Sequence, residues 1–188
     1  MPAQRLPALS PPYPDEVAAT IERMMPGGAP PIALFRTVAH HPGVLERFRT
    51  TGALLLRHGV LDPRDREIVL LRTTARCGAA YEWGVHVTGF SAEVGLTEEQ
   101  VRATAGGDAD DPAWREEDRA LVRLADVLHD DAAVPEALWE ELAARYEPDA
   151  LIELIAVAGF YHLVSYLANG LRVEPEPWAA PMPARSAV

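Results

Sequence analysis

An acid and an imidazole lie one helical turn apart in the segment AAYEWGVH, residues 79–86. Residues at i and i+4 share a helix face, so Glu82 and His86 would lie side by side. A carboxylate beside an imidazole can move a proton near neutral pH. The same spacing also occurs in solvated ion pairs, which contribute only a few tenths of a kcal/mol to stability. The pattern alone leaves both interpretations open.

A second carboxylate, Glu67, precedes this pair on a separate predicted helix. Asp62 is a good N-cap and is followed by a proline suited to the first helical turn. The break at 77–78 predicts that this helix and the next pack as a hairpin, with Glu67 facing Glu82 and His86. Two carboxylates near one imidazole would push pKa values apart, as general acid–base chemistry requires. Alternatively, Glu67 is only an early-turn acid that favours the helix dipole.

The rest of the chain also predicts helices, because alanine and leucine dominate the candidate core and aromatics make up only 7%. No segment is a convincing strand. The segments expected to be helical are 15–25, 32–40, 44–59, 62–76, 79–95, 97–105, 112–130, 135–146 and 148–171. The last is apolar on nearly every face, which indicates burial within the subunit or between subunits.

The chain of 188 residues predicts a single domain with proline-rich arms at about 1–14 and 173–188. Such arms either lie across a neighbouring subunit or are disordered. Together with the apolar segment 148–171, they predict a homo-oligomer, a dimer at least.

Composition excludes several classes of partner. The net charge is −11 and all 17 cationic residues are arginine, so nucleic acid is an unfavourable partner. The single cysteine, Cys77, rules out an intrachain disulfide and fits a reducing cytoplasm. We expect no secretory signal, and no uninterrupted apolar run reaches the length of a membrane span.

The stretch from 61 to 101 resembles the carboxymuconolactone decarboxylase family, which shares its fold with the alkylhydroperoxidase D-like proteins. The features that carry the resemblance are Arg66-Glu67, Leu71-Arg72, Tyr81-Glu82-Trp83, His86 and the ending GLTEEQ. The apolar segment near the end resembles the last helix of longer members. The resemblance implies an all-α, alkylhydroperoxidase D-like helical bundle that assembles into homo-oligomers, commonly trimers or hexamers.

The sequence departs from the peroxidase branch of that fold, which carries Cys-x-x-Cys followed by a histidine. Aligning that histidine on His86 puts Ala79 and Glu82 at the two cysteine positions. Peroxide reduction by a dithiol needs a nucleophilic thiolate and a nearby resolving thiol, and one cysteine cannot supply both. Glu67 and His86 match the proton-relay positions, so the acid–base half of the site is retained, as in the decarboxylase-like branch.

The resemblance therefore implies cofactor-free chemistry on a small organic acid or lactone, with Glu67, Glu82 and His86 as catalytic residues. Decarboxylation leaves a carbanion or dienolate, to which His86 would deliver a proton. Candidate substrate-binding residues are Arg72 for a carboxylate, Tyr81 for an oxyanion, and Tyr161 and His162, which interrupt the last apolar segment. Each of these four also has a plain structural interpretation, as a surface arginine or a packed side chain. Glu82, His86 and His162 could ligate a metal, but the spacing is weak and we expect none.

Two alternatives remain. The chain is a non-catalytic oligomer that binds a small acid or serves as a scaffold, or it is a thiol-dependent peroxidase that uses Cys77. Convergence of Glu67, Glu82 and His86 on a closed pocket would favour the lyase or isomerase over the scaffold.

Overall fold

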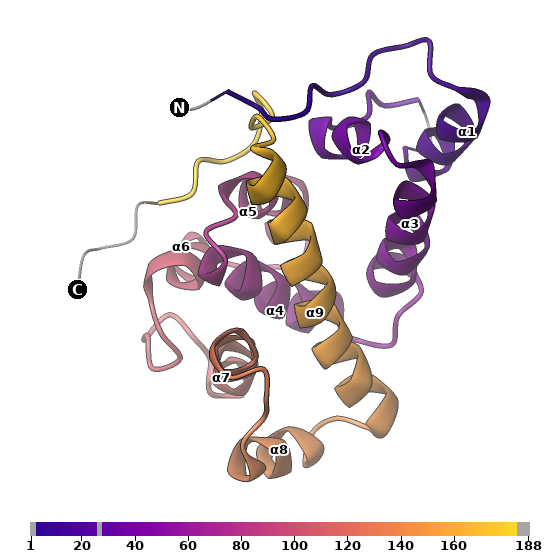
Figure 1. Ribbon diagram of the computed structural model, residues 1–188. Coiled ribbons are helices and arrows are strands. Elements are labelled where there is room, and N and C mark those ends of the chain that lie inside the picture. Colours follow the sequence, from indigo (N-terminus) through magenta and orange to yellow (C-terminus); the bar gives the residue numbers. More distant parts are fainter. Residues whose placement is uncertain (1–2, 26–27, 184–188) are drawn as a thin grey trace.

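The computed structural model describes residues 3–25 and 28–183, and within these ranges the secondary structure is entirely helical (Figure 1). The prediction of an all-α fold is therefore confirmed. The elements are α1 (Asp15–Met24), α2 (Ala33–Val38), α3 (Pro42–Arg57), α4 (Pro63–Arg76), α5 (Ala80–His86), the π-helix η1 (Val87–Ser91), α6 (Glu98–Gly106), α7 (Glu116–Asp130), α8 (Glu136–Ala143) and α9 (Pro148–Leu171).

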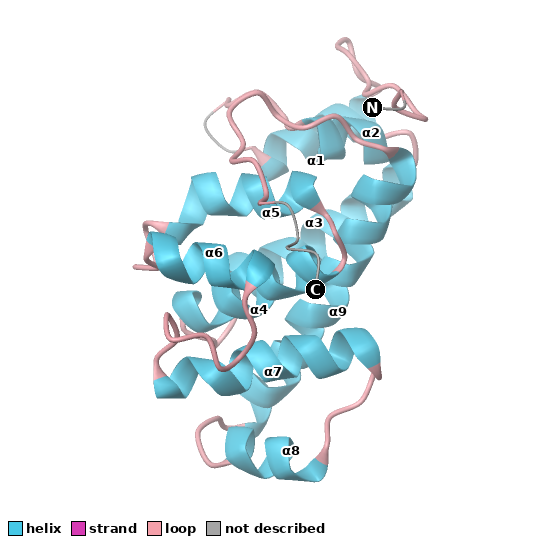
Figure 2. Ribbon diagram, turned by 90° about the vertical axis from the view of Figure 1, so that its left-hand side faces the viewer, coloured by secondary structure: helices cyan, strands magenta, loops and turns pink. Residues whose placement is uncertain are grey.

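Helix α4 lies at the centre and packs against α5, α6, α7 and α9. Nine consecutive residues, 67–75, are buried, so this helix is covered on every side. Two arginine–carboxylate pairs fasten it to the α7 region: Arg64 binds Asp118, and Arg72 binds Asp126 at 2.6 and 2.9 Å. Bidentate pairs of this kind fix orientation as well as distance. Figure 2 shows α8 at the end of the molecule farthest from α1 and α2.

Helix α9 runs along the molecule from α8 to the neighbourhood of α5 (Figure 1). Within the chain it is buried only in part, because one side exposes large apolar side chains, namely Ile152, Ile155, Leu163 and Tyr166. By length and composition α9 could cross a membrane, and half of its apolar window is buried inside this domain. One such helix is weak evidence for a membrane span.

The predicted hairpin forms around a glycine. Asp62 caps α4 by accepting a hydrogen bond from the Arg64 N–H at 2.8 Å, and Gly78, at φ +63°, reverses the chain toward α5. The helix expected over 79–95 is shorter than predicted, because a π-helix replaces its second half from Val87 onward. Single π-helical turns of this kind are frequent at functional sites.

The described parts of both proline-rich arms lie against their own chain. The N–H of Arg5 donates to the carbonyl of Leu171 at 3.0 Å, and that of Ala180 donates to the carbonyl of Gly84 at 3.3 Å. The outermost residues of the predicted arms, 1–2 and 184–188, lie outside the described ranges. The C-terminal arm thus clamps the side of α5 that carries Gly84, which is opposite to the face shared by Glu82 and His86.

Gly84 permits this close approach because a Cβ there would lie 2.2 Å from the carbonyl oxygen of Ala180. We expect Gly84→Ala to displace the arm and to lower the free energy of unfolding by about 1–3 kcal/mol, the usual range for overpacking. Gly89→Ala is the matched control, since a Cβ there meets nothing within 4 Å. It should be neutral or stabilising by up to about 1 kcal/mol. Urea unfolding and limited proteolysis of the arm measure both, and equal behaviour of the two variants would contradict the clamp.

Candidate functional site

Three helices bring two carboxylates and a phenol around one imidazole. His86 Nδ1 lies 2.9 Å from Glu67 Oε1, and His86 Nε2 lies 3.4 Å from Glu82 Oε1 and 3.2 Å from the Tyr161 hydroxyl. Their exposed fractions are 0% for Glu67, 7% for Glu82, 3% for His86 and 1% for Tyr161. The structure thus brings together the three residues that the sequence grouped and adds Tyr161 from α9; we call these four the relay cluster.

The fold positions each member of the relay cluster for a local reason. Glu67 lies in the second turn of α4, and the turn at Gly78 folds α5 back alongside it. The helix spacing then places Glu82 and His86 on the face toward α4. Phe90, in the π-helical turn, packs on the imidazole with ring centroids 4.9 Å apart. The π-turn therefore gives the His86 ring its apolar cover.

The charge on His86 follows from this geometry. Burial by itself lowers the pKa of an imidazole, but the adjacent Glu67 and Glu82 carboxylates outweigh burial and raise the pKa of His86 to about 10. At neutral pH the ring is therefore an imidazolium that donates Nδ1–H to Glu67. Its second proton, on Nε2, points to the Tyr161 oxygen and Glu82.

The relay cluster also contains two carboxylate oxygens that accept no hydrogen bond from the described residues. Glu67 Oε2 and Glu82 Oε2 are buried side-chain atoms without a hydrogen-bond partner in the described chain. Burial, and then the two carboxylates, raise the pKa of the Tyr161 hydroxyl well above its usual value, so the phenol keeps its proton. Buried polar atoms are nearly always paired, so the two carboxylate oxygens are suited to accept protons or hydrogen bonds from a ligand.

Arg72, which the sequence suggested as a carboxylate clamp, is placed elsewhere. Its Nε and Nη2 bind Asp126, and its Nη1 donates to the carbonyls of Thr104 and Gly107 at 3.2 and 2.7 Å. Nearly all of its donors are therefore committed to α6 and α7. The physical reason is the five-residue step from Glu67, which turns Arg72 to another side of α4.

Arg66 is an arginine that the sequence analysis did not assign to substrate. It is half-buried, and its Nε is buried without a hydrogen-bond partner in the described chain. Its charge lies close enough to oppose the rise in the pKa of Tyr161. The only sequence signal was its position beside Glu67, which does not tell which way its side chain extends.

Tyr81 holds the C-terminal arm. Its hydroxyl donates to Glu176 Oε1 at 2.7 Å and accepts from the N–H of Leu34 at 3.0 Å. Glu176 also accepts from the N–H of Ala33, at the start of α2. Both hydroxyl contacts are therefore structural. Tyr81 links the C-terminal arm to the helical bundle and is not part of the relay cluster.

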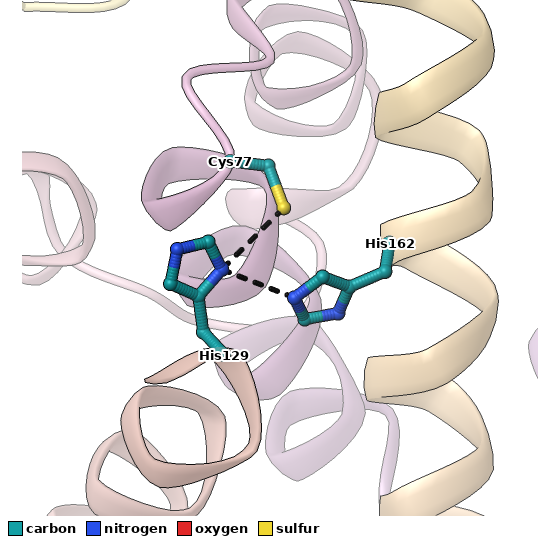
Figure 3. A group of neighbouring side chains, drawn as sticks. All are labelled: Cys77, His129 and His162. Atoms are coloured by element: carbon teal, nitrogen blue, oxygen red, sulfur yellow. Dashed lines mark hydrogen bonds between the residues drawn. The ribbon is translucent and has the colours of Figure 1, made fainter. Parts of the chain in front are cut away.

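His162 neighbours Tyr161 in sequence but faces a different group. Its Nε2 lies 3.1 Å from His129 Nδ1, and His129 Nδ1 lies 3.7 Å from Cys77 Sγ (Figure 3). His162 is thus separated from Glu82 and His86, and the metal set considered for those three residues does not form.

The members of the relay cluster are buried, and two clefts elsewhere on the surface do not reach them. One cleft of about 540 Å³ is lined by α1 and by residues just before and after it, and another of about 410 Å³ lies between α8 and the start of α9. Neither includes a member of the relay cluster. Glu67, Glu82 and His86 therefore converge, and Phe90, which packs on the imidazole, is itself 38% exposed.

Comparisons with known proteins agree with this architecture. Residues 42–126 match the model of the carboxymuconolactone decarboxylase family. Among solved structures, the debrominase Bmp8 in complex with 2,3,4-tribromopyrrole has a TM-score of 0.77 at 14% identity, covering 94% of each chain. A search of the curated proteins finds no match.

Two further structures extend the likeness. An uncharacterized peroxidase-related protein from Ralstonia eutropha JMP134, with an alkylhydroperoxidase AhpD core, has a TM-score of 0.77 at 20% identity over 94% of each chain. Another, from Silicibacter sp. TM1040, has a TM-score of 0.76 at 17% identity, covering 94% of this chain and 95% of that one. Likeness at this level of identity concerns the fold. The chain therefore has the alkylhydroperoxidase D-like fold, and its residues 42–126 match the carboxymuconolactone decarboxylase family.

Proposed function

We propose that the protein is a cofactor-independent enzyme that decarboxylates or isomerises a small organic acid or lactone by proton transfer. One observation carries this proposal: the buried imidazole of His86 is held between the carboxylates Glu67 and Glu82. A fully enclosed, protonated imidazole with fixed partners is a preorganised proton donor. The match of residues 42–126 to the carboxymuconolactone decarboxylase family supports the same class of chemistry.

In a decarboxylation, the C–C bond to the carboxylate breaks, CO₂ leaves, and the electron pair remains as a dienolate. His86 Nε2–H then protonates the carbon, and the neutral imidazole regains a proton from solvent. Glu67 fixes the ring through Nδ1, while Glu82 and the Tyr161 hydroxyl lie beside the reacting nitrogen. In an isomerisation, the Glu82 carboxylate removes a proton from one carbon and His86 Nε2–H delivers a proton to another. The proton on Glu82 then passes to the neutral imidazole beside it, which restores both groups.

A negatively charged substrate needs a cation to offset the two carboxylates. Arg66 is suited to this role because it is half-buried and its charge acts on Tyr161. The guanidinium group binds carboxylates in a bidentate manner. We therefore assign to Arg66 the clamp that the sequence suggested for Arg72.

The structural neighbours favour a small ligand. Bmp8 is a debrominase, and its structure contains 2,3,4-tribromopyrrole, a small ring compound.

The peroxidase-related neighbours support a second candidate function, that of a thiol peroxidase that uses Cys77. Its Sγ contacts His129 rather than His86, so the thiol is separate from the relay cluster. Peroxide turnover that Cys77→Ser abolishes would favour this candidate.

A non-catalytic scaffold is the third candidate, and enclosure of the relay cluster is the observation in its favour. It differs from the enzyme in what mutation does: loss of a structural cluster lowers stability and leaves no chemical step to lose. Turnover and stability must therefore be measured on the same variants.

The proposed enzyme acts as a cytoplasmic homo-oligomer. The exposed apolar side of α9, with Ile152, Leu163 and Tyr166, is a surface that a second copy would cover. The acidic charge and the arginine-only cations disfavour nucleic acid as a partner.

The first prediction concerns turnover. With candidate lactones and small diacids as substrates, followed by CO₂ release or absorbance, His86→Ala should lower kcat by about 10²–10⁴, the usual contribution of a positioned acid or base. Glu67→Gln and Glu82→Gln keep shape but remove charge, and should also lower kcat. Double variants should lose little more than the worst single variant, because members of one relay act as a unit.

His58→Ala is the matched control, since His58 is exposed at the end of α3 and should leave turnover unchanged. Full activity in folded His86→Ala protein would end the relay proposal. Additive losses of stability with unchanged turnover would favour the scaffold.

The second prediction concerns pH. The pKa of His86 is raised in the folded state, so its stabilising contribution is complete below the unfolded value near 6.5 and is lost as pH rises toward 10. Between these values the folded state binds more protons, and stability should fall by up to about 1.4 kcal/mol per pH unit. Urea unfolding of the wild type between pH 6.5 and 9.5 measures this slope. His86→Gln should remove the contribution and His58→Gln should retain it; identical slopes in all three would contradict the assigned charge.

The third prediction concerns assembly. Light scattering at micromolar concentration should give at least a dimeric mass. Leu163→Glu together with Tyr166→Glu should shift it toward the monomer, because charge on an apolar interface is strongly unfavourable. Replacement of the exposed pair Glu98 and Arg102 by Ala is the control, and it should leave the mass unchanged. A wild-type monomer would overturn the proposed oligomer.

A further inference from the structure

A second cluster of chemically active side chains lies outside the relay cluster. Cys77 follows α4, His129 lies near the end of α7, and His162 lies in α9, and their ligand atoms converge on one point (Figure 3). Cys77 Sγ, His129 Nδ1 and His162 Nε2 all lie within 4.8 Å of one another, and each residue is half-buried. The proposed reaction uses none of them.

The spacing of these atoms matches tetrahedral coordination. Zn–N bonds of 2.0–2.1 Å and Zn–S bonds of about 2.3 Å place two nitrogens about 3.3 Å apart, and sulfur about 3.6 Å from nitrogen. The corresponding distances are 3.1 Å from His129 Nδ1 to His162 Nε2 and 3.7 Å from Cys77 Sγ to His129 Nδ1. The third pair lies within 4.8 Å, so a small side-chain movement closes the triangle.

Hydrogen bonding orients the His162 ring as a ligand. Its Nδ1 lies 2.8 Å from the carbonyl of Ala158, to which only an N–H can donate. In the neutral ring this leaves the lone pair on Nε2, directed at His129 Nδ1. A metal-bound histidine characteristically donates its other ring N–H to a carbonyl or carboxylate, which fixes the tautomer in this way.

The shared nitrogen cannot satisfy both neighbours through one proton of its own. If His129 Nδ1 carries a proton, it donates to His162 and has no lone pair for the Cys77 thiol. If it accepts from the thiol, two nitrogen lone pairs face each other at 3.1 Å. A cation placed between sulfur and the two nitrogens binds all three lone pairs at once.

We propose that Cys77, His129 and His162 bind one Zn²⁺ ion, with a solvent molecule or an exogenous ligand at the fourth position. One thiolate and two imidazoles form a donor set that suits this borderline-soft ion. Binding replaces the thiol proton by the metal, so that Cys–SH and Zn²⁺ give Cys–S–Zn⁺ and H⁺. Half-burial of all three residues leaves the site reachable from solvent.

The ion would join three core helices next to the relay cluster. Cys77 directly precedes the turn at Gly78 that positions α5, and His162 follows Tyr161 in α9. Bound zinc would therefore stiffen the turn between α4 and α5 without contacting His86. The expected consequence is a higher melting temperature of the metal-loaded protein.

Metal binding by the full chain tests this proposal. Protein stripped with a chelator and titrated with Zn²⁺ should bind one equivalent per chain and gain a higher Tm, which EDTA reverses. Co²⁺ as a spectroscopic probe should give thiolate-to-metal charge-transfer absorption. Cys77→Ser should remove that absorption, and Cys77→Ser and His162→Gln should each weaken Zn²⁺ affinity by more than about 100-fold, since even outer-shell changes cost 10–100-fold.

His58→Gln, which removes an exposed histidine far along the chain from this cluster, is the control and should bind zinc like the wild type. Circular dichroism establishes that each variant is folded before titration. Wild-type affinity retained by both ligand variants, or no Zn²⁺ binding at micromolar concentration, would overturn the site. A parallel titration with Cu²⁺ tests the choice of ion, because saturation by copper with no binding of zinc would overturn the zinc assignment.

Discussion

The ion pair between Glu67 and His86 is the interaction on which the rest of the structure depends. Both groups are withdrawn from water, and desolvation of a charge costs several kcal/mol unless close partners compensate. The 2.9 Å contact supplies one partner, and Glu82 and Tyr161 supply others around the same ring. This arrangement requires α4 to be enclosed by α5 and α9, which explains why a charged residue occupies a helix that is buried along nine consecutive positions. The clamp of the C-terminal arm on Gly84 closes the remaining side of α5.

The sequence was informative where local rules decide the structure. Capping by Asp62, the glycine at 78 and the i,i+4 spacing of Glu82 and His86 are local signals, and the hairpin follows from them. The π-helical turn after His86 was missed because its sequence, VTGFS, is also compatible with an α-helix. Arg72 was assigned to substrate because it is near Glu67 in sequence, whereas its actual partner, Asp126, lies 54 residues away.

The cluster of Cys77, His129 and His162 is a stronger example of contacts that local sequence signals do not predict. Its residues are separated by 52 and 33 positions, and no spacing rule for metal ligands connects them. Each residue alone has an ordinary structural interpretation: a cysteine before a turn, a histidine near a helix C-terminus, and a histidine in an apolar helix. Only the crossing of α4, α7 and α9 brings them together, and that crossing is decided by long-range packing of α4 between its neighbours.

The two histidine clusters differ in the groups that their ring nitrogens contact, and therefore in the chemistry that suits them. A metal ligand must be an unprotonated nitrogen, but His86 lies between two carboxylates that hold a proton on each ring nitrogen. His162 instead donates one N–H to a neutral carbonyl and keeps a lone pair on the other nitrogen. Carboxylates beside an imidazole thus favour proton transfer, and a carbonyl beside an imidazole favours metal binding. Because Tyr161 and His162 are consecutive, one turn of α9 directs these two environments to different sides of the helix.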